Sequence, residues 1–195
     1  HHLRQQTPKP NDEDPNYCLA DFIAPEGYED YIGGFAVTSG HEISKLLSSY
    51  EDDYSKIMVQ ALADRLAEAF AEAIHKHART IAWGYSKDET LDNEELIKEK
   101  YVGVRPAPGY PACPEHSEKA SLFKLLKVTE TIGITLTENF AMSPAASVSG
   151  WFFSHPDARY FGVGKINDEQ VKDYAERKGI QFSQAKKLLQ PNLMD

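Results

Sequence analysis

The segment from Asp53 to Ala82 constrains the fold more than any other part of the sequence, because it contains no glycine or proline. It is rich in alanine, leucine and glutamate, which have high helix propensity, so one long helix is predicted over residues 53–82. Because a helix that is apolar nearly all round is normally packed on more than one side, we expect such packing here. A wide apolar arc comprises Ile57, Met58, Ala61, Leu62, Leu66, Ala69, Phe70, Ala73 and Ile74, and the opposite arc carries the small residues Ala63, Ala67 and Ala71.

A narrow acidic stripe runs along the same predicted helix. Asp64, Glu68, Glu72 and His75 are spaced at i, i+4, i+8 and i+11, which aligns them on one face. The stripe is either the single solvent-exposed edge of the helix or the lining of a cleft. For Glu72 and His75 we favour the solvent-exposed edge.

The remaining elements are shorter and mixed in type. Capping residues and apolar periodicity predict helices over 92–100, 117–127, 167–178 and 183–189. Aromatic and β-branched runs predict strands over 17–23, 31–38, 132–140, 147–153 and 159–166. Because strands and helices do not alternate regularly, the expected fold class is α+β, with a mixed or antiparallel sheet, one long helix and several shorter ones. We treat residues 1–195 as a single domain.

Charge and cysteine content exclude several classes of protein. The formal net charge of −9 argues against binding to nucleic acid or to an anionic membrane surface, because both need a basic face. No apolar run approaches the roughly 20 residues that a membrane-spanning helix requires. The only cysteines, Cys18 and Cys113, are most simply read as reduced thiols. We therefore expect a cytoplasmic protein without a nucleic-acid or membrane partner.

Motifs for phosphate, metal or nucleophilic chemistry are weak. Gly162 and Gly164 lack the third glycine and the helix start of a phosphate-binding turn. Cys113 and His116 have ligand spacing, but no second pair completes a zinc site, so no metal site is expected. A small α+β hydrolase that uses Cys113 and His116 is the alternative if no family resemblance is considered.

The loop from Val104 to Ala112 is the most informative segment. It contains three prolines, which fix φ and make the loop stiff before any ligand arrives. Such a loop could aim the guanidinium of Arg105 at a carboxylate beside the flat ring of Tyr110, and Gly109 would allow a close approach to the backbone. This combination suits an amino-acid or nucleoside ligand. The alternative, which spacing alone favours, is a structural loop whose arginine pairs with an internal acid.

Longer blocks of sequence carry a family resemblance. Arg105, Gly109 and Tyr110 form an R-x-x-x-G-Y signature within RPAPGYPACPEH. Together with NYCLADFIAP at 16–25, ALADRLAEAFAE at 61–72 and VSGWFFSHPDARYF at 148–161, this block resembles the activation domain of cobalamin-dependent methionine synthase. The resemblance runs from HHLRQQ to the PNL near the C-terminus. It implies a segment before HHLRQQ, with an aspartate that contacts the ligand's amino group, and we expect this chain to lack that segment.

The resemblance implies a function in reactivating the parent enzyme. That enzyme is a methyltransferase that transfers a methyl group from 5-methyltetrahydrofolate to homocysteine in methionine biosynthesis. Its activation domain binds S-adenosylmethionine and presents the methyl group for reductive methylation of inactive cob(II)alamin. The implied partners are the cobalamin-binding domain of the same parent chain and flavodoxin or a flavoprotein reductase. Cobalamin is bound mainly by another domain, and zinc only elsewhere in the parent enzyme. We therefore expect no catalytic residue and no catalysis in this piece alone.

The resemblance also implies roles for individual residues. Arg105 is expected to bind the ligand carboxylate, the backbone around Ala107 to contact adenine, and Gly109 to permit that approach. Tyr110 is expected to face both the ligand and the corrin. The further implied positions are Tyr160 and Phe161 in a second contact segment, Glu68 and Glu99 as acids near the ligand, and Asp64 toward cobalamin. The alternative function is a docking module for the cobalamin domain and flavodoxin, without ligand binding of its own.

Overall fold

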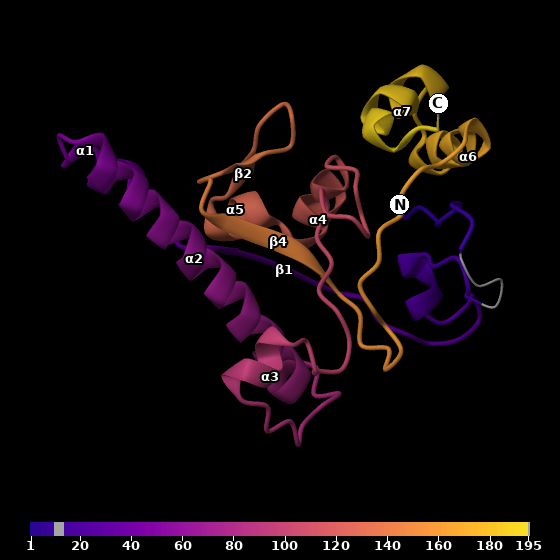
Figure 1. Cartoon of the computed structure of the whole chain (residues 1–195), viewed down its shortest axis with the longest axis horizontal. Helices are drawn as coiled ribbons and strands as arrows, with labels where there is room; N and C mark the ends of the chain where they lie inside the picture. Colours follow the sequence, from indigo (N-terminus) through magenta and orange to yellow (C-terminus); the bar gives the residue numbers. More distant parts are fainter. Residues whose placement is uncertain (10–13, 195) are drawn as a thin grey trace.

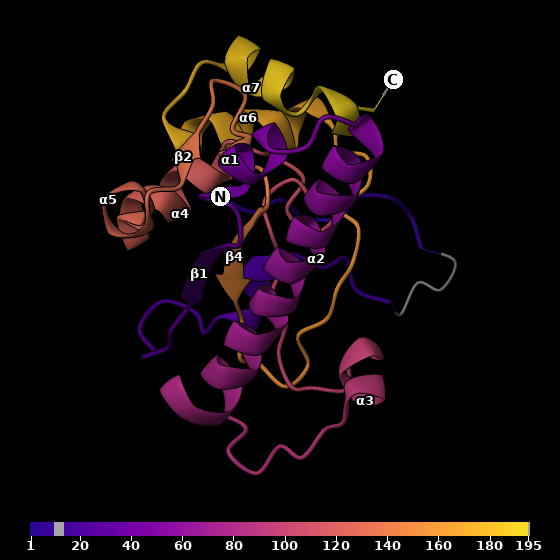
Figure 2. The same cartoon turned by 90° about the vertical axis from the view of Figure 1, so that its left-hand side faces the viewer.

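The sheet at the centre of the molecule has two antiparallel strands. The computed structural model describes residues 1–9 and 14–194. Strand β1 (Gly33–Thr38) pairs with β4 (Ser147–Phe152), in a register that runs from Gly33 opposite Phe152 to Thr38 opposite Ser147. Helix α2 (Asp53–His77) crosses one face of this sheet (Figures 1 and 2). The predicted strands over 31–38 and 147–153 are thus confirmed, and the mixture of antiparallel strands and helices is of the α+β class.

The long predicted helix is confirmed, but its packing is not as expected. The side chain of Asp52 accepts a hydrogen bond from the Ser55 amide at 2.7 Å and caps the start of α2, which continues as a turn of π-helix over Ala78–Ala82. Ala63, Ala67 and Ala71 are the buried residues against the sheet, whereas the large apolar side chains of the wide arc are largely exposed. The expectation of packing on more than one side is therefore wrong for the described residues. Small alanines allow the helix axis to approach the sheet closely, and larger side chains would hold it away.

The alanine face gives a first prediction, which concerns stability. Ala67 is 1% exposed, so a leucine there is expected to overpack the interface between α2 and the sheet and to cost about 2 kcal/mol of unfolding free energy. Urea denaturation followed by circular dichroism measures this. The matched control is Ala69→Leu, because Ala69 is exposed on the same helix and should change stability by less than about 0.5 kcal/mol. Equal effects of the two variants would contradict the proposed packing.

The shorter predicted helices are confirmed to within a few residues. They are α3 (Asn93–Ile97), α4 (Glu118–Leu126), α6 (Asp168–Lys178) and α7 (Phe182–Leu188). Asp92 and Glu95 form a reciprocal capping box at α3, and Gly179 ends α6 with a left-handed φ of 69°. Helices α6 and α7 pack on each other around a separate apolar cluster that includes Val171, Tyr174 and Leu189. Two further helices, α1 (Ile43–Ser48) and α5 (Val128–Ile132), had no clear sequence signal.

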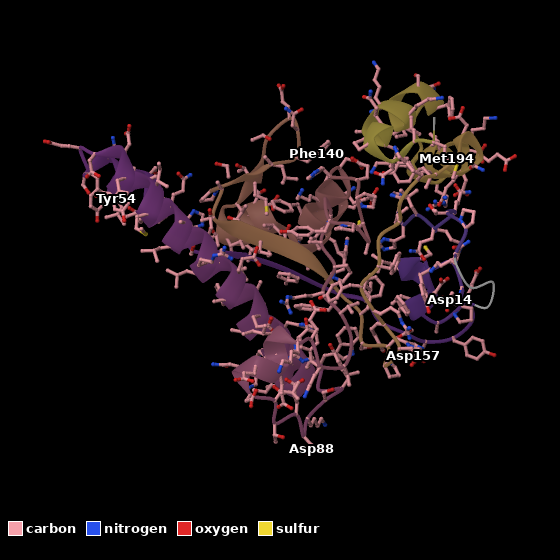
Figure 3. All side chains as sticks on the ribbon, in the orientation of Figure 1. Asp14, Tyr54, Asp88, Phe140, Asp157 and Met194 are labelled. Atoms are coloured by element: carbon pink, nitrogen blue, oxygen red, sulfur yellow. The ribbon has the colours of Figure 1, made fainter. Side chains whose placement is uncertain are left out.

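Three predicted strands are wrong. Residues Leu19–Phe22 form a 3₁₀-helix, because the Asp21 side chain accepts a hydrogen bond from the Cys18 amide and closes a tight turn. The 132–140 segment contains the end of α5 and only a short strand, β2 (Thr135–Leu136), which pairs with β3 (Met142–Ser143). Phe140 lies in the turn of that hairpin with a φ of 58° (Figure 3).

The third wrong strand is 159–166, whose backbone bonds to loops rather than to a strand. The amide of Val163 donates to the carbonyl of Pro111 at 2.9 Å, and the amide of Ile166 donates to that of Asn192 at 2.7 Å. The first contact ties the segment to the ligand loop predicted at 104–112, and the second ties it to the 3₁₀ turn Gln190–Asn192. Within the described residues, no helix is both long and apolar enough to cross a membrane.

Candidate functional site

A cavity of about 480 Å³ lies between α2, the proline-rich loop and the segment after β4. Its lining combines charged side chains with aromatic rings and prolines, which is typical of a site for a small organic ligand. The lining residues are Phe35, Glu68, Glu99, Arg105, Pro106, Ala107, Tyr110, Pro111, Ala112, Val148, Tyr160 and Phe161.

Most of the expected ligand-binding residues meet at this cavity. Seven line it, although they come from four separate segments of the chain: Glu68, Glu99, Arg105, Ala107, Tyr110, Tyr160 and Phe161. Gly109 and Asp64 are not among the lining residues. Gly109 has a φ of 99°, and a Cβ there would lie 2.4 Å from Cε1 of His116, so packing against that imidazole requires the glycine. Asp64 is exposed, one helical turn before Glu68.

Backbone hydrogen bonds to β4 and to Phe153, the residue that follows it, hold the proline-rich loop in place. Val104 and Phe153 exchange two bonds of 3.0 Å, and the Trp151 amide donates to the carbonyl of Pro106 at 2.9 Å. The loop therefore lies along the outer edge of β4 as an irregular third strand. Pro106 has no amide hydrogen to return the bond that it accepts from Trp151, so the regular ladder between the loop and β4 ends at this residue. This arrangement fixes the position from which the Arg105 side chain extends.

Arg105 forms a buried network with residues of α2 and of the loop after α3. Its Nη2 lies 2.6 Å from Oε2 of Glu72, and its Nη1 donates to the hydroxyl of Tyr101 at 2.9 Å. Nη1 also lies 3.3 Å from Nδ1 of His75, and the Arg105 amide donates to the hydroxyl of Tyr160 at 3.0 Å. The loop arginine thus pairs with an internal acid, as the structural alternative for this loop required.

The interpretation of Glu72 and His75 as a solvent-exposed edge is wrong. The Glu72 side chain is only 27% exposed and His75 is fully buried, because the arginine loop covers this part of the acidic stripe. Glu68, one turn earlier, lines the cavity, so the cleft alternative applies to this part of the helix. The regular spacing of the stripe was the sequence signal that placed these groups together. It did not reveal which of them meets the arginine.

His75 acts as a neutral acceptor within this network. Burial, and then the positive charges of Arg79 and Arg105, lower its pKa to about 2. The ring therefore stays uncharged at neutral pH, and Nδ1 accepts from Arg105 if the proton is on Nε2. The imidazole also stacks on Phe152, with ring centroids 4.9 Å apart. His75 thus supports the guanidinium without adding a competing charge.

Both Arg105 and Glu72 keep side-chain atoms that can form further hydrogen bonds. A guanidinium has five N–H donors, and the contacts above use only part of them on the side chain of Arg105. Oε1 of Glu72 is buried and has no hydrogen-bond partner among the described residues. The exposed carboxylates of Glu68 and Glu99 add negative charge at the cavity, and the ring of Tyr110 is 58% exposed beside them. The arrangement suits a small molecule that carries a carboxylate, a cationic group and a flat ring.

The hydrolase alternative finds no support in the geometry. Cys113 is buried, and burial raises the pKa of its thiol to about 12, so the nucleophilic thiolate is scarce at neutral pH. His116 is exposed, and its Nδ1 lies 2.8 Å from Nζ of Lys119 rather than against the thiol. In the part of the chain that the structure describes, no three His, Cys, Asp or Glu side chains form a group that could hold a metal ion.

Comparisons with known proteins agree on one family. A family model described as "Vitamin B12 dependent methionine synthase, activation domain" matches residues 1–179. A solved structure described as the MetH reactivation domain bound to AdoHcy is similar over the whole chain, with 58% sequence identity and a TM-score of 0.96. The match covers 100% of this chain and 61% of that chain, so this chain spans less than two thirds of the length of its relative.

Proposed function

The chain belongs to the activation-domain family of vitamin B12-dependent methionine synthase, and on that premise we propose that it binds S-adenosylmethionine in the cavity around Arg105 and presents the ligand's methyl group to cobalamin. The observation that carries this proposal is the meeting of seven expected contact residues at one cavity. The relative's complex with AdoHcy supports it, because that ligand is S-adenosylmethionine without the transferred methyl group and the positive charge on sulfur.

The residues present fit the ligand's chemical groups. The free donors of Arg105 match a carboxylate, which a planar guanidinium can bind through two parallel hydrogen bonds. The carboxylates of Glu68 and Glu99 favour an ammonium and a sulfonium electrostatically. The backbone at Ala107 and the rings of Tyr110, Tyr160 and Phe161 offer flat, largely apolar surface for adenosine. Gly109 keeps the loop compact rather than lining the cavity itself.

The contribution of this chain to the reaction is orientation. Cobalamin would be held mainly by another domain of the parent enzyme, and when bound it would supply the acceptor for the methyl group in reductive methylation. The stiff loop and the Arg105 network hold the amino-acid end of the ligand, so the sulfonium methyl group can adopt few orientations. Tyr110 and Asp64 lie exposed near the cavity side of α2 and are the residues we assign to the cobalamin contact. No residue of this chain is assigned a bond-making role, and the chain alone is not expected to be catalytic.

The wider setting follows from the family. We place the activity in methionine biosynthesis from homocysteine, in the cytoplasm, with the methyltransferase reaction, the folate site and the zinc site belonging to other parts of the parent enzyme. The partners are the cobalamin-binding domain of the same parent chain and flavodoxin or a flavoprotein reductase as the electron source. No nucleic-acid or membrane partner is proposed.

A second candidate is a docking module that does not bind S-adenosylmethionine by itself. One observation favours it: Arg105 is already paired with Glu72. Isothermal titration of the purified chain with S-adenosylmethionine separates the two. Saturable binding that S-adenosylhomocysteine competes away supports the first function. Absent binding, together with retained association with the cobalamin-binding domain, supports the second.

Tyr160 gives a prediction for the bound state. Its hydroxyl accepts the hydrogen bond from the Arg105 amide, so Tyr160→Phe removes one support of the loop while keeping the ring. Losing one neutral hydrogen bond costs about 1 kcal/mol, so S-adenosylmethionine should bind about 5-fold more weakly by titration. Tyr28→Phe is the matched control, because Tyr28 is 76% exposed and away from the cavity. Unchanged affinity in Tyr160→Phe would contradict a role for the Tyr160 hydroxyl in ligand binding.

A further inference from the structure

Tyr101 is a buried tyrosine that contacts Arg105 from outside the ligand cavity. It lies in the segment that connects α3 to the proline-rich loop, and it is 7% exposed. Its hydroxyl accepts a hydrogen bond of 2.9 Å from Nη1 of Arg105. Tyr101 is not among the residues that line the cavity and lies instead at a separate surface hollow of about 320 Å³. An influence of Tyr101 on a ligand in the cavity must therefore pass through another residue.

The ring of Tyr101 is held on several sides. Cζ of Arg79 lies 4.4 Å from the ring centroid, and Cζ of Arg105 lies 5.6 Å from it. Both arginines are thus close enough for a cation–π contact. The imidazole of His75 meets the ring edge-on, with centroids 5.0 Å apart. Because the carboxylate of Glu89 fixes Arg79 through two hydrogen bonds, the ring of Tyr101 and its hydroxyl have little room to move.

A tight turn fixes the backbone between Tyr101 and Arg105. Gly103, midway between them, has a φ of 82°, in the left-handed region that favours glycine. A Cβ at Gly103 would lie 2.3 Å from the carbonyl oxygen of Phe153, so any other residue would push this segment away from the end of β4. The next residue, Val104, exchanges backbone hydrogen bonds with Phe153. The phenol and the guanidinium are therefore attached to one rigid piece of backbone.

The contacts of Arg105 decide which edge of its guanidinium is left for a ligand. Nη1 carries two hydrogens and has two acceptors, the Tyr101 hydroxyl at 2.9 Å and Nδ1 of His75 at 3.3 Å. Nη2 lies 2.6 Å from the carboxylate of Glu72 and can use one of its two hydrogens there. These contacts leave the hydrogen of Nε and one hydrogen of Nη2. Two such hydrogens are enough for a pair of parallel bonds to a carboxylate.

Tyr101 contacts the guanidinium without cancelling its charge. Burial raises the pKa of the Tyr101 phenol well above its ordinary value, so the hydroxyl is neutral at neutral pH. Of the three acceptors named above, only Glu72 carries a charge. A second carboxylate in the place of Tyr101 would leave Arg105 less attractive to an anion. A neutral phenol fixes the direction of the guanidinium and keeps its positive charge available.

We propose that Tyr101 is a positioning residue for the ligand's carboxylate: with His75 it occupies Nη1 of Arg105, so that the guanidinium presents its Nε and Nη2 edge to the cavity. This inference rests on the proposed binding of S-adenosylmethionine. It makes Tyr101 part of the recognition of the ligand's amino-acid end, although the two do not touch. It gives Tyr101 no part in holding the adenosine.

Titration of a Tyr101→Phe variant with two ligands tests the proposal. The variant keeps the ring and its contact with Arg79 and loses only the hydroxyl. S-adenosylmethionine should bind about 10-fold more weakly, because the lost hydrogen bond is to a charged group. Decarboxylated S-adenosylmethionine lacks only the carboxylate, so its affinities for the variant and for the wild-type chain should agree within about 2-fold. NMR titration measures both ligands, because it also detects weak binding.

The comparison of the two ligands separates positioning from a purely structural role. An equal loss of affinity for both ligands would show that Tyr101 only supports the fold, and unchanged affinity for S-adenosylmethionine would show that its hydroxyl has no role. Either result would overturn the proposal. Tyr54→Phe is the matched control, because Tyr54 is 74% exposed at the far end of α2 (Figure 3). Failure of the wild-type chain to bind S-adenosylmethionine would instead overturn the proposed function, and this inference with it.

A crystal structure of the wild-type chain with S-adenosylmethionine adds a test that does not depend on a variant. The ligand's carboxylate should lie against Nε and Nη2 of Arg105, with the bond from Nη1 to Tyr101 intact. A carboxylate bound through Nη1, with the Tyr101 hydroxyl displaced from it, would overturn the proposal even if the ligand occupied the expected cavity.

Discussion

Replacing Arg105 with alanine is expected to weaken S-adenosylmethionine binding by at least about 100-fold, because two charge-assisted hydrogen bonds to a carboxylate contribute about 3 kcal/mol together. The same change leaves Glu72 without the cation that lies 2.6 Å from its carboxylate. Isothermal titration measures the loss. Arg105→Lys keeps the charge but not the planar fork, so it should bind between the wild-type protein and Arg105→Ala.

Two controls make the Arg105 result interpretable. Arg65→Ala removes an exposed arginine of α2 and should leave the affinity unchanged. Circular dichroism and thermal unfolding of Arg105→Ala show whether the fold survives the loss of the Glu72 pair. A folded Arg105→Ala variant with wild-type affinity would contradict the assignment of the carboxylate to this arginine.

The second large effect concerns stability at the base of α2. Arg79 is completely buried, and its Nε and Nη2 bond to the two carboxylate oxygens of Glu89 at 2.6 and 2.8 Å. Glu89→Gln keeps the shape but removes the charge, so a buried guanidinium is left uncompensated. Breaking one side of such a pair costs about 3–5 kcal/mol, and we expect the lower end of this range because the amide oxygen still accepts one hydrogen bond. Urea denaturation measures the change.

An exposed pair on α3 provides the comparison for Glu89→Gln. Glu94 lies 3.7 Å from Lys98, and the Glu94 side chain is 84% exposed. Glu94→Gln should therefore alter the unfolding free energy by less than about 0.5 kcal/mol. If the two glutamine variants were equally stable, the Arg79–Glu89 pair would not hold the end of α2 as described. Because Arg79 stacks over Tyr101, 4.4 Å from its ring centroid, the destabilised variant should also bind ligand less well.

The parts of the fold that could be predicted from sequence are the helices whose formation depends on their own residues and caps. Helix α2 was predictable because no residue in it opposes helix formation, and α6 because Asn167 caps its start and Gly179 its end. The strand predicted at 17–23 failed because the side chain of Asp21 offers the backbone a competing hydrogen bond. The strand at 159–166 failed because its backbone partners are a loop residue, Pro111, and a residue of a 3₁₀ turn, Asn192, both distant in sequence. Composition alone does not reveal such partners.

The site was predictable in its parts but not in its internal contacts. The blocks around Arg105 and Tyr160 indicated which segments meet, and the structure places them at one cavity. The pairing of Arg105 with Glu72 and His75 was missed, because a helical stripe of acids has the same spacing whether it faces water or a loop. The packing of α2 through its alanine face, and not through its wide apolar arc, was missed for a related reason. The most strongly apolar face of a helix normally packs on the core, whereas here close approach to the sheet selects the alanine face.

A crystal structure of this chain grown with S-adenosylmethionine tests the central claim most directly. We expect ligand density in the cavity lined by Arg105, Ala107 and Tyr110, with the carboxylate within hydrogen-bond distance of the guanidinium and the adenine against the loop backbone. Ligand density confined to another part of the surface, or an empty Arg105 cavity at saturating ligand, would contradict this assignment of the binding site.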